Sequence, residues 1–149
     1  MIKKIFIFIF FFITGCGYQP IYISEITDNY SFKKITLIGN NKINKSIVSA
    51  LNLKIDNTDD NNNEVIISSD INIFETSKNS KGQVASYRTS ININFKIRNN
   101  EEIIKNKNFT KDFSYNNKEN KFKLVEYQKD VENSLTKKII EEIIIDLNL

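Results

Sequence analysis

Tyr87-Arg88-Thr89-Ser90-Ile91-Asn92-Ile93-Asn94-Phe95-Lys96-Ile97-Arg98 is the stretch that decides the fold of this 149-residue chain. Its odd-numbered positions are apolar apart from Thr89, and its even-numbered positions are all polar or charged. Successive side chains of a strand point to opposite faces of the sheet. The alternation therefore predicts a strand with one buried face and one wet face, as in an antiparallel sheet covered on one side only.

The segments on either side of this strand predict two partners for it. Residues 64–76 form a second predicted strand, whose buried face carries Ile67, Ile71 and Ile73. A hairpin loop at 77–83, with Gly82, joins the two. After a turn at 98–101, a further strand follows, whose apolar face carries Phe109, Phe113 and Tyr115. Lys111 interrupts that face, which predicts an edge position or a bulge.

Two helices and one more strand complete the pattern. Residues 32–38 predict a first strand that ends at Gly39, and 57–63 contain no apolar residue and predict an exposed loop. A short helix ending near Leu53 follows from apolar residues at helical spacing: Ile43, Ile47, Ala50 and Leu51. A long amphipathic helix begins near Lys121, after asparagines suited to capping, and its apolar stripe includes Val131, Leu135, Ile139, Ile143 and Leu147.

The order is strand, helix, three meandering strands, helix, and each element has one apolar face. The simplest closed arrangement is an α+β two-layer sandwich, with two helices packed on one face of a four-stranded, mostly antiparallel sheet. Hydrophobic residues make up 40% and charged residues 26%, as in a globular domain. We expect one such domain at 31–149.

The amino-terminal residues predict a secretory signal at 1–15. Lys3 and Lys4 precede the apolar run 5–13, which is too short to cross a membrane as a helix of about 20 residues. Ile13-Thr14-Gly15-Cys16 then resembles the lipobox of bacterial lipoproteins. That resemblance implies acylation of Cys16, a lipidated tether at 16–30, and, because Gly17 is not Asp, sorting to the outer membrane. The alternative is a membrane-anchored helix with a free cysteine.

Little in the composition suggests catalysis. The chain has one Cys and no His, so the commonest general base and metal ligand are missing. The carboxylate pairs Asp59-Asp60 and Glu101-Glu102 lie in predicted loops or turns. We expect no enzyme activity, no metal and no cofactor. The net charge of +3 includes the two lysines of the signal, and it does not predict binding to nucleic acid.

Three stretches together resemble the LptE family of lipopolysaccharide-assembly lipoproteins, in its alphaproteobacterial branch. They are Gly15-Cys16-Gly17-Tyr18-Gln19-Pro20-Ile21-Tyr22, then Ala85-Ser86-Tyr87-Arg88-Thr89, and the run from Phe113-Ser114-Tyr115-Asn116 to Leu147. The resemblance implies a non-enzymatic outer-membrane lipoprotein, anchored by its acyl chains on the periplasmic side. Its partner would be the barrel protein LptD, which it plugs and helps to assemble, and the pair would insert lipopolysaccharide into the outer leaflet.

The polar face of the predicted sheet provides the candidate site. The residues expected to contact a polar barrel lumen are Ser90, Asn92, Asn94, Asn108 and Thr110. Three basic residues on the same strand face are candidates for lipopolysaccharide phosphates: Arg88, Lys96 and Arg98. Three alternatives remain open: an ordinary solvated face, a periplasm-facing lipoprotein that binds a small lipid or cell-wall ligand in its own cavity, and an envelope enzyme.

Overall fold

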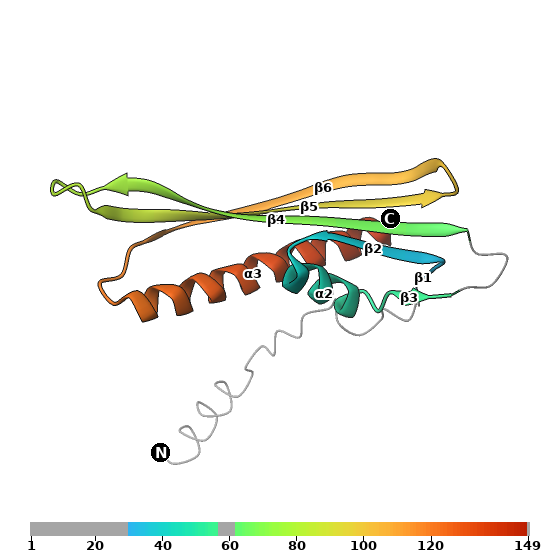
Figure 1. Ribbon diagram of the computed structural model, residues 1–149, viewed down its shortest axis with the longest axis horizontal. Helices are drawn as coiled ribbons and strands as arrows, with labels where there is room; N and C mark the ends of the chain where they lie inside the picture. The colour runs from blue at the N-terminus through green and yellow to red at the C-terminus, as the bar shows by residue number, and fades with distance from the viewer. Residues whose placement is uncertain (1–29, 57–61, 149) are drawn as a thin grey trace, which may run out of the picture.

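The sheet of the computed structural model, which describes residues 30–56 and 62–148, is built mainly from three long antiparallel strands. They are β4 (Asn63–Lys78), β5 (Val84–Asn99) and β6 (Glu102–Asn116). The short strand β2 (Lys34–Gly39) pairs in parallel with the first half of β4, so the sheet order is β2-β4-β5-β6. Both helices lie on the same side of this sheet (Figure 1). The predicted α+β two-layer fold is confirmed.

Helix α2 (Asn41–Ala50) begins directly after β2, and two residues produce the change of direction. Gly39 has a φ of +87°, which favours glycine. Asn40 then caps the helix, because its side-chain Oδ1 accepts hydrogen bonds from the backbone N–H groups of Lys42 (3.0 Å) and Ile43 (3.1 Å). Asn40 also donates its own backbone N–H to the carbonyl of Ser69 on β4 (3.1 Å), which fixes the start of α2 against the sheet.

Helix α3 (Lys121–Leu147) runs along the length of β5 and β6 (Figure 1). Asn120 caps it by accepting hydrogen bonds from the N–H groups of Phe122 (2.9 Å) and Lys123 (3.2 Å), in agreement with the capping role predicted for this segment. Its buried residues include four members of the predicted stripe: Val131, Leu135, Ile139 and Ile143. The stripe therefore packs into the core.

The core lies between the helix layer and the odd-numbered residues of β5. Ile91, Ile93 and Phe95 are almost fully buried there, against Val65 and Ile67 of β4 and the two helices. Full burial of each such side chain stabilises a fold by about 1.5–3 kcal/mol. The apolar side chains of the alternating stretch therefore form the core that joins the sheet to the helices.

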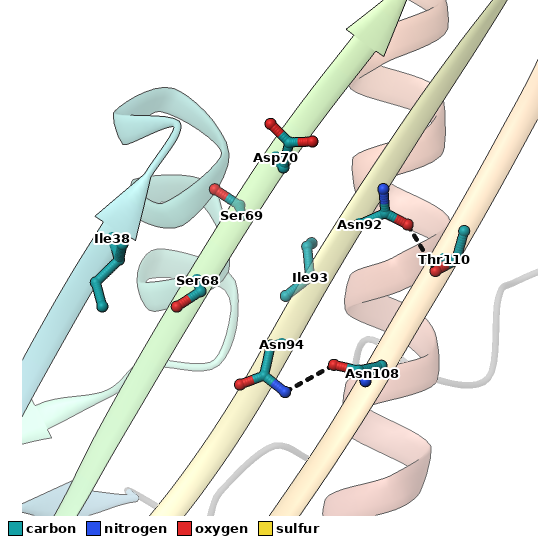
Figure 2. A pocket seen from close by; sticks show the side chains of 9 residues that line it. All are labelled: Ile38, Ser68, Ser69, Asp70, Asn92, Ile93, Asn94, Asn108 and Thr110. Atoms are coloured by element: carbon teal, nitrogen blue, oxygen red, sulfur yellow. Dashed lines mark hydrogen bonds between the residues drawn. The ribbon is translucent and has the colours of Figure 1, made fainter.

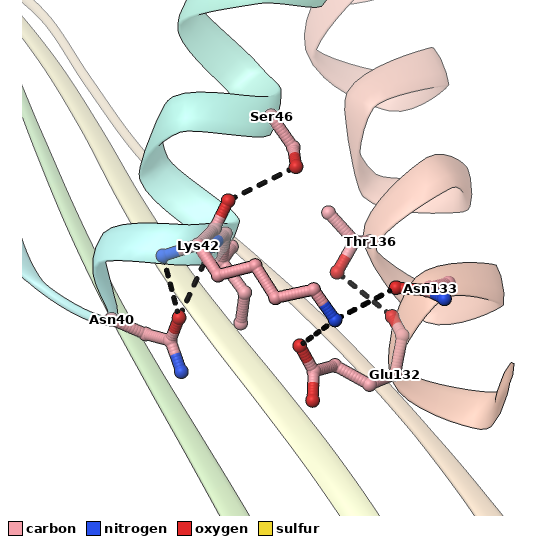
Figure 3. A network of polar contacts seen from close by, with 7 residues as sticks. Asn40, Lys42, Ser46, Glu132, Asn133 and Thr136 are labelled. Atoms are coloured by element: carbon pink, nitrogen blue, oxygen red, sulfur yellow. Dashed lines mark hydrogen bonds and ion pairs between the residues drawn. The ribbon is translucent and has the colours of Figure 1, made fainter. Parts of the chain in front are cut away.

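Polar contacts join the two helices at the surface (Figure 3). The ammonium group of Lys42 on α2 lies 3.0 Å from the carboxylate of Glu132 and donates a hydrogen bond to the side-chain oxygen of Asn133 (3.0 Å) on α3. The Lys42 side chain is 57% exposed and that of Glu132 is 18% exposed, so solvent screens the pair in part. These contacts connect the short helix to the long one.

The structure differs from the sequence-based expectations in three places. The predicted strand 32–38 is interrupted at Lys33, so that β1 (Ser31–Phe32) pairs in parallel with a short strand β3 (Lys54–Ile55) instead. The hairpin loop is shorter than predicted, because β4 continues to Lys78. Ile73 of β4 is 48% exposed, although it lies on the predicted face. The pairing of β2 with β4 stops at Ser69, and Ile73 lies beyond it on an open edge.

Candidate functional site

The outer face of the sheet, which we define as the side opposite the helices, is polar, and backbone register brings its predicted residues together. Asn92 and Asn94 of β5 lie directly opposite Thr110 and Asn108 of β6, and Ser90 lies opposite Asp112. The structure therefore places all five predicted barrel-contact residues on one continuous surface. Their assignment to barrel contact stays a prediction.

Side-chain hydrogen bonds orient the amides of this face. The Asn94 side chain donates through Nδ2 to the Oδ1 atoms of Asn108 (2.7 Å) and Asn106 (2.8 Å). The Thr110 hydroxyl donates to Oδ1 of Asn92 (2.8 Å). All three bonds join β5 to β6, and Figure 2 shows those that Asn108 and Asn92 accept. Within residues 30–56 and 62–148, the Nδ2 groups of Asn92 and Asn108 have no hydrogen-bond partner, so they can donate to a ligand or partner.

Strand β4 contributes residues to this face that the sequence-based prediction did not include. Ser68 and Asp70 lie opposite Asn94 and Asn92, and all four residues line a shallow hollow of about 430 Å³ with Ile38 of β2. The sequence contained a signal for them, because Ser68 and Asp70 occupy even positions, whereas the predicted buried residues Ile67, Ile71 and Ile73 occupy odd positions. Parity of position would have placed them on the outer face.

Arg98 forms an ion pair with Glu64 across β5 and β4. Its Nε donates to a Glu64 carboxylate oxygen at 2.8 Å, and its terminal nitrogen lies 2.6 Å from the same oxygen. The hydrogen bond from Arg98 is the main cause that holds the pKa of Glu64 below its ordinary value. Arg98 was predicted to bind phosphate, but its positive charge is already compensated by Glu64.

Arg88 has weaker partners. Its Nε donates to the hydroxyl of Ser114 (3.2 Å) and lies 4.0 Å from the carboxylate of Asp112, and both charged side chains are more than half exposed. Such an exposed pair is weak. Arg98 lies ten positions after Arg88 on the same extended strand, a span of about 33 Å. Lys96 lies beside Arg98, so the three predicted basic residues form two separate positions and not one cluster.

The part of the chain that the structure describes has neither a cluster suited to a metal ion nor a membrane-spanning helix. Residues 30–56 and 62–148 contain no group of three acidic, cysteine or histidine side chains placed to hold a metal ion. No helix within these ranges is long and apolar enough to span a membrane. Cys16, the predicted acylation site, and the pair Asp59-Asp60 lie outside the described residues.

The fold and the polar face define a class of protein: a two-layer α+β domain that presents a hydrogen-bonding sheet surface. A family model described as "LptE: Lipopolysaccharide-assembly" matches residues 18–147, which is most of the chain. The chain belongs to the LptE family. It is a lipopolysaccharide-assembly lipoprotein of the cell envelope, and the family is not one of enzymes.

Solved structures share the fold at low sequence identity. The rare lipoprotein B from Shewanella oneidensis is 11% identical with a TM-score of 0.58, and the alignment covers 77% of this chain and 93% of that one. Lipoprotein B from Nitrosomonas europaea is 10% identical (TM-score 0.54; 78% and 81% covered), and a putative lipoprotein from Caulobacter crescentus is 8% identical (TM-score 0.52; 76% and 85% covered). No curated protein matches the chain by sequence.

Proposed function

We propose that this protein is a lipid-anchored plug of the outer-membrane barrel LptD, and that it assists barrel assembly and the insertion of lipopolysaccharide into the outer leaflet. Membership of the LptE family supports this role. The observation that carries it in the structure is the polar outer face of β4, β5 and β6. A barrel lumen is lined by polar groups, so a plug needs a surface that donates and accepts hydrogen bonds.

The composition of the outer face supports contact with such a wall. Asn92, Asn94, Asn108 and Thr110 carry amide and hydroxyl groups, which both donate and accept. Their mutual hydrogen bonds hold the side chains in fixed positions, so that binding a partner costs less conformational entropy than it would for mobile side chains. Ser90 extends the same surface toward the hairpin.

Anchoring is the second part of the proposal. Acylation of Cys16 would hold the chain at the outer membrane on its periplasmic side. One acyl chain gives marginal binding at about 0.8 kcal/mol per buried CH₂, whereas several chains give stable attachment. Mass measurement of the purified mature protein tests this directly. A product that starts at Cys16 and carries acyl groups supports the proposal, and an unmodified thiol behind an intact residue 1–15 segment contradicts it.

Contact with the barrel can be tested by site-specific crosslinking. A photoreactive amino acid at position 92 or 108 should crosslink to LptD in living cells, and the matched position 141, on the exposed face of α3, should crosslink less. Copurification of wild-type protein from detergent-solubilised membranes should yield an equimolar complex with a large barrel protein. Recovery of the lipoprotein alone would favour instead a carrier of a small lipid or cell-wall ligand.

A further inference from the structure

The hollow on the outer face lies where β2 ends, and β4 continues without that neighbour. Its rim contains Ile38 at the end of β2 and Asp70 of β4, and the side chains of Asn92, Asn94 and Asn108 reach it from β5 and β6 (Figure 2). We propose that this hollow binds an uncharged, hydroxyl-rich group: a sugar ring in the oligosaccharide part of lipopolysaccharide.

The hollow can both donate and accept hydrogen bonds. The Nδ2 groups of Asn92 and Asn108 have donors without partners among the described residues, because internal bonds occupy only the Oδ1 atoms of these two amides. Asn94 shows the reverse arrangement, since its Nδ2 is occupied and its Oδ1 is available. A sugar hydroxyl both donates and accepts. The hollow thus offers donors and acceptors within reach of adjacent hydroxyl groups.

The lining of the hollow carries a negative charge and no positive one. Asp70 is the charged residue that lines the hollow, and the lining includes no Lys or Arg. A phosphate placed there would meet a carboxylate without a cation to offset the repulsion, whereas a hydroxyl group can donate to the same carboxylate. The basic residues Arg88 and Lys96 lie on the same face outside the hollow. The site therefore selects the sugar part of a charged glycolipid.

Ile38 gives the hollow an apolar wall. Ile38 is 53% exposed at the end of β2, next to the polar side chains of the hollow. A pyranose ring has hydroxyl groups at its rim and C–H groups on its faces, so it can bury apolar surface against Ile38 while its hydroxyls bond to the asparagines. A hollow with only polar walls would give a sugar no such advantage over water.

The source of the sugar rests on the proposed function, since lipopolysaccharide is the glycolipid that the family assembles. In a plugged barrel this hollow would face the lumen wall, and the oligosaccharide would pass between the two proteins. The hollow is formed by this chain alone, so binding of the sugar can be measured without the barrel.

The test measures binding of three probes to the mature protein, purified from membranes in a detergent without sugar groups. The probes are lipopolysaccharide oligosaccharide stripped of acyl chains and phosphates, the same oligosaccharide with its phosphates, and a muropeptide from the cell wall. Saturation-transfer NMR followed by titration should detect binding of the dephosphorylated oligosaccharide. Binding that requires the phosphates, stronger binding of the muropeptide, or no signal with millimolar oligosaccharide would each overturn the inference.

Two isosteric variants localise the site. Asn108 and Asn106 both accept a hydrogen bond from Asn94, but only Asn108 lines the hollow. Asn108→Asp keeps the acceptor and removes the donor, so it should weaken oligosaccharide binding about tenfold. Asn106→Asp makes the same change of charge and should bind like the wild type. Asn92→Ala serves as a second variant of the lining and should also weaken binding.

Equal affinities of the Asn108→Asp and Asn106→Asp variants would contradict the location of the site. Copurification of LptD with the wild-type protein separates this outcome from failure of the proposed function. A protein that retains the barrel but binds no sugar would refute the inference alone. A protein that binds the oligosaccharide but never copurifies with a barrel would refute the plugging role.

Discussion

The hydroxyl of Thr89 lies 3.0 Å from the phenol oxygen of Tyr115, and both side chains are buried on the helix-facing side of the sheet. The two residues are diagonal neighbours, because Tyr115 pairs with Tyr87 in the register of β5 and β6. Tyr115 also makes an edge contact with Tyr127 of α3, with ring centroids 5.5 Å apart. This hydrogen bond therefore lies at the junction of two strands and the long helix.

We expect Tyr115→Phe to destabilise the protein by about 1–2 kcal/mol, because it leaves the Thr89 hydroxyl buried without its partner. The double variant Tyr115→Phe/Thr89→Val should recover part of that loss, since neither polar group then remains. Urea unfolding of the four proteins measures the coupling. Simple additivity of the two single changes would mean that the hydrogen bond contributes nothing to stability.

The sequence was sufficient to predict the layers of this fold but not their extent. Alternation in β5 identified the buried face of the sheet. Lys111 predicted that the last strand lies at an edge or carries a bulge; β6 does lie at the edge of the sheet, and the ammonium of Lys111 pairs with Glu142 of α3. The exposure of Ile73 was not predictable, because the pattern within β4 contains no information on where β2 ends. The pairing of β1 with β3 was missed for a related reason: each strand has only two residues, too few for any periodicity.

The same reasoning explains how far the site could be predicted. Parity of position placed Asn92, Asn94, Asn108 and Thr110 on one face, and register joined them. The ion pair of Arg98 with Glu64 depends on the alignment of β4 with β5, which the sequence does not encode locally. A row of basic residues at even spacing therefore looked uniform in the sequence, although its members differ in the structure.

Glycine is required at position 39 for two reasons. A Cβ there would lie 1.9 Å from the carbonyl oxygen of Ser69, and the φ of +87° is unfavourable for other residues. We expect Gly39→Ala to destabilise the protein by more than about 3 kcal/mol, because β2 must separate from β4 to relieve the clash. Thermal unfolding measures the effect.

Gly82 provides the matched control for this substitution. It also has a positive φ, of +76°, but a Cβ there would have no neighbour within 4 Å. Gly82→Ala should therefore cost only the backbone strain, about 1–2 kcal/mol. Similar losses at the two positions would show that the clash with Ser69 is relieved without cost.

Acid should weaken the attachment of α3 to the edge strand. Lys107 and Lys105 of β6 both pair with Asp146 near the end of the helix, and the hydrogen bond from Lys107 is the main cause that holds the pKa of Asp146 below its ordinary value. A lowered pKa means that this carboxylate stabilises the fold above the ordinary aspartate pKa of about 4. That stabilisation is lost as the pH falls through the lowered value.

The expected result is a lower urea midpoint at pH 3 than at pH 7, with a smaller difference in Asp146→Asn. Glu141→Gln is the matched control, since Glu141 is exposed on the same helix and forms no ion pair within the described residues. An unchanged pH dependence in Asp146→Asn would exclude this cluster as a cause of the acid sensitivity. Loss of the dependence in both variants would point to the overall charge instead.

The contrast between Arg88 and Arg98 leads to the last prediction. Arg98 already pairs with Glu64, whereas Arg88 has only a hydroxyl and a distant carboxylate beside it. An arginine whose charge is not compensated can bind phosphate at a lower cost of rearrangement. We therefore expect Arg88→Ala to weaken binding of intact lipopolysaccharide by about tenfold, and more than Arg98→Ala does.

For stability we expect the reverse order: Arg98→Ala should have the larger effect and Arg88→Ala the smaller one. Arg98→Ala leaves Glu64, which is 21% exposed, without its partner and should lower the urea midpoint, and the further change Glu64→Ala should restore part of it. Arg88→Ala should leave the midpoint nearly unchanged, because exposed pairs contribute little. Titration with purified lipopolysaccharide at low and high salt completes the test, since a phosphate contact through Arg88 must weaken as salt rises. Equal affinity of wild type and Arg88→Ala at low salt would remove this residue from the proposed contact.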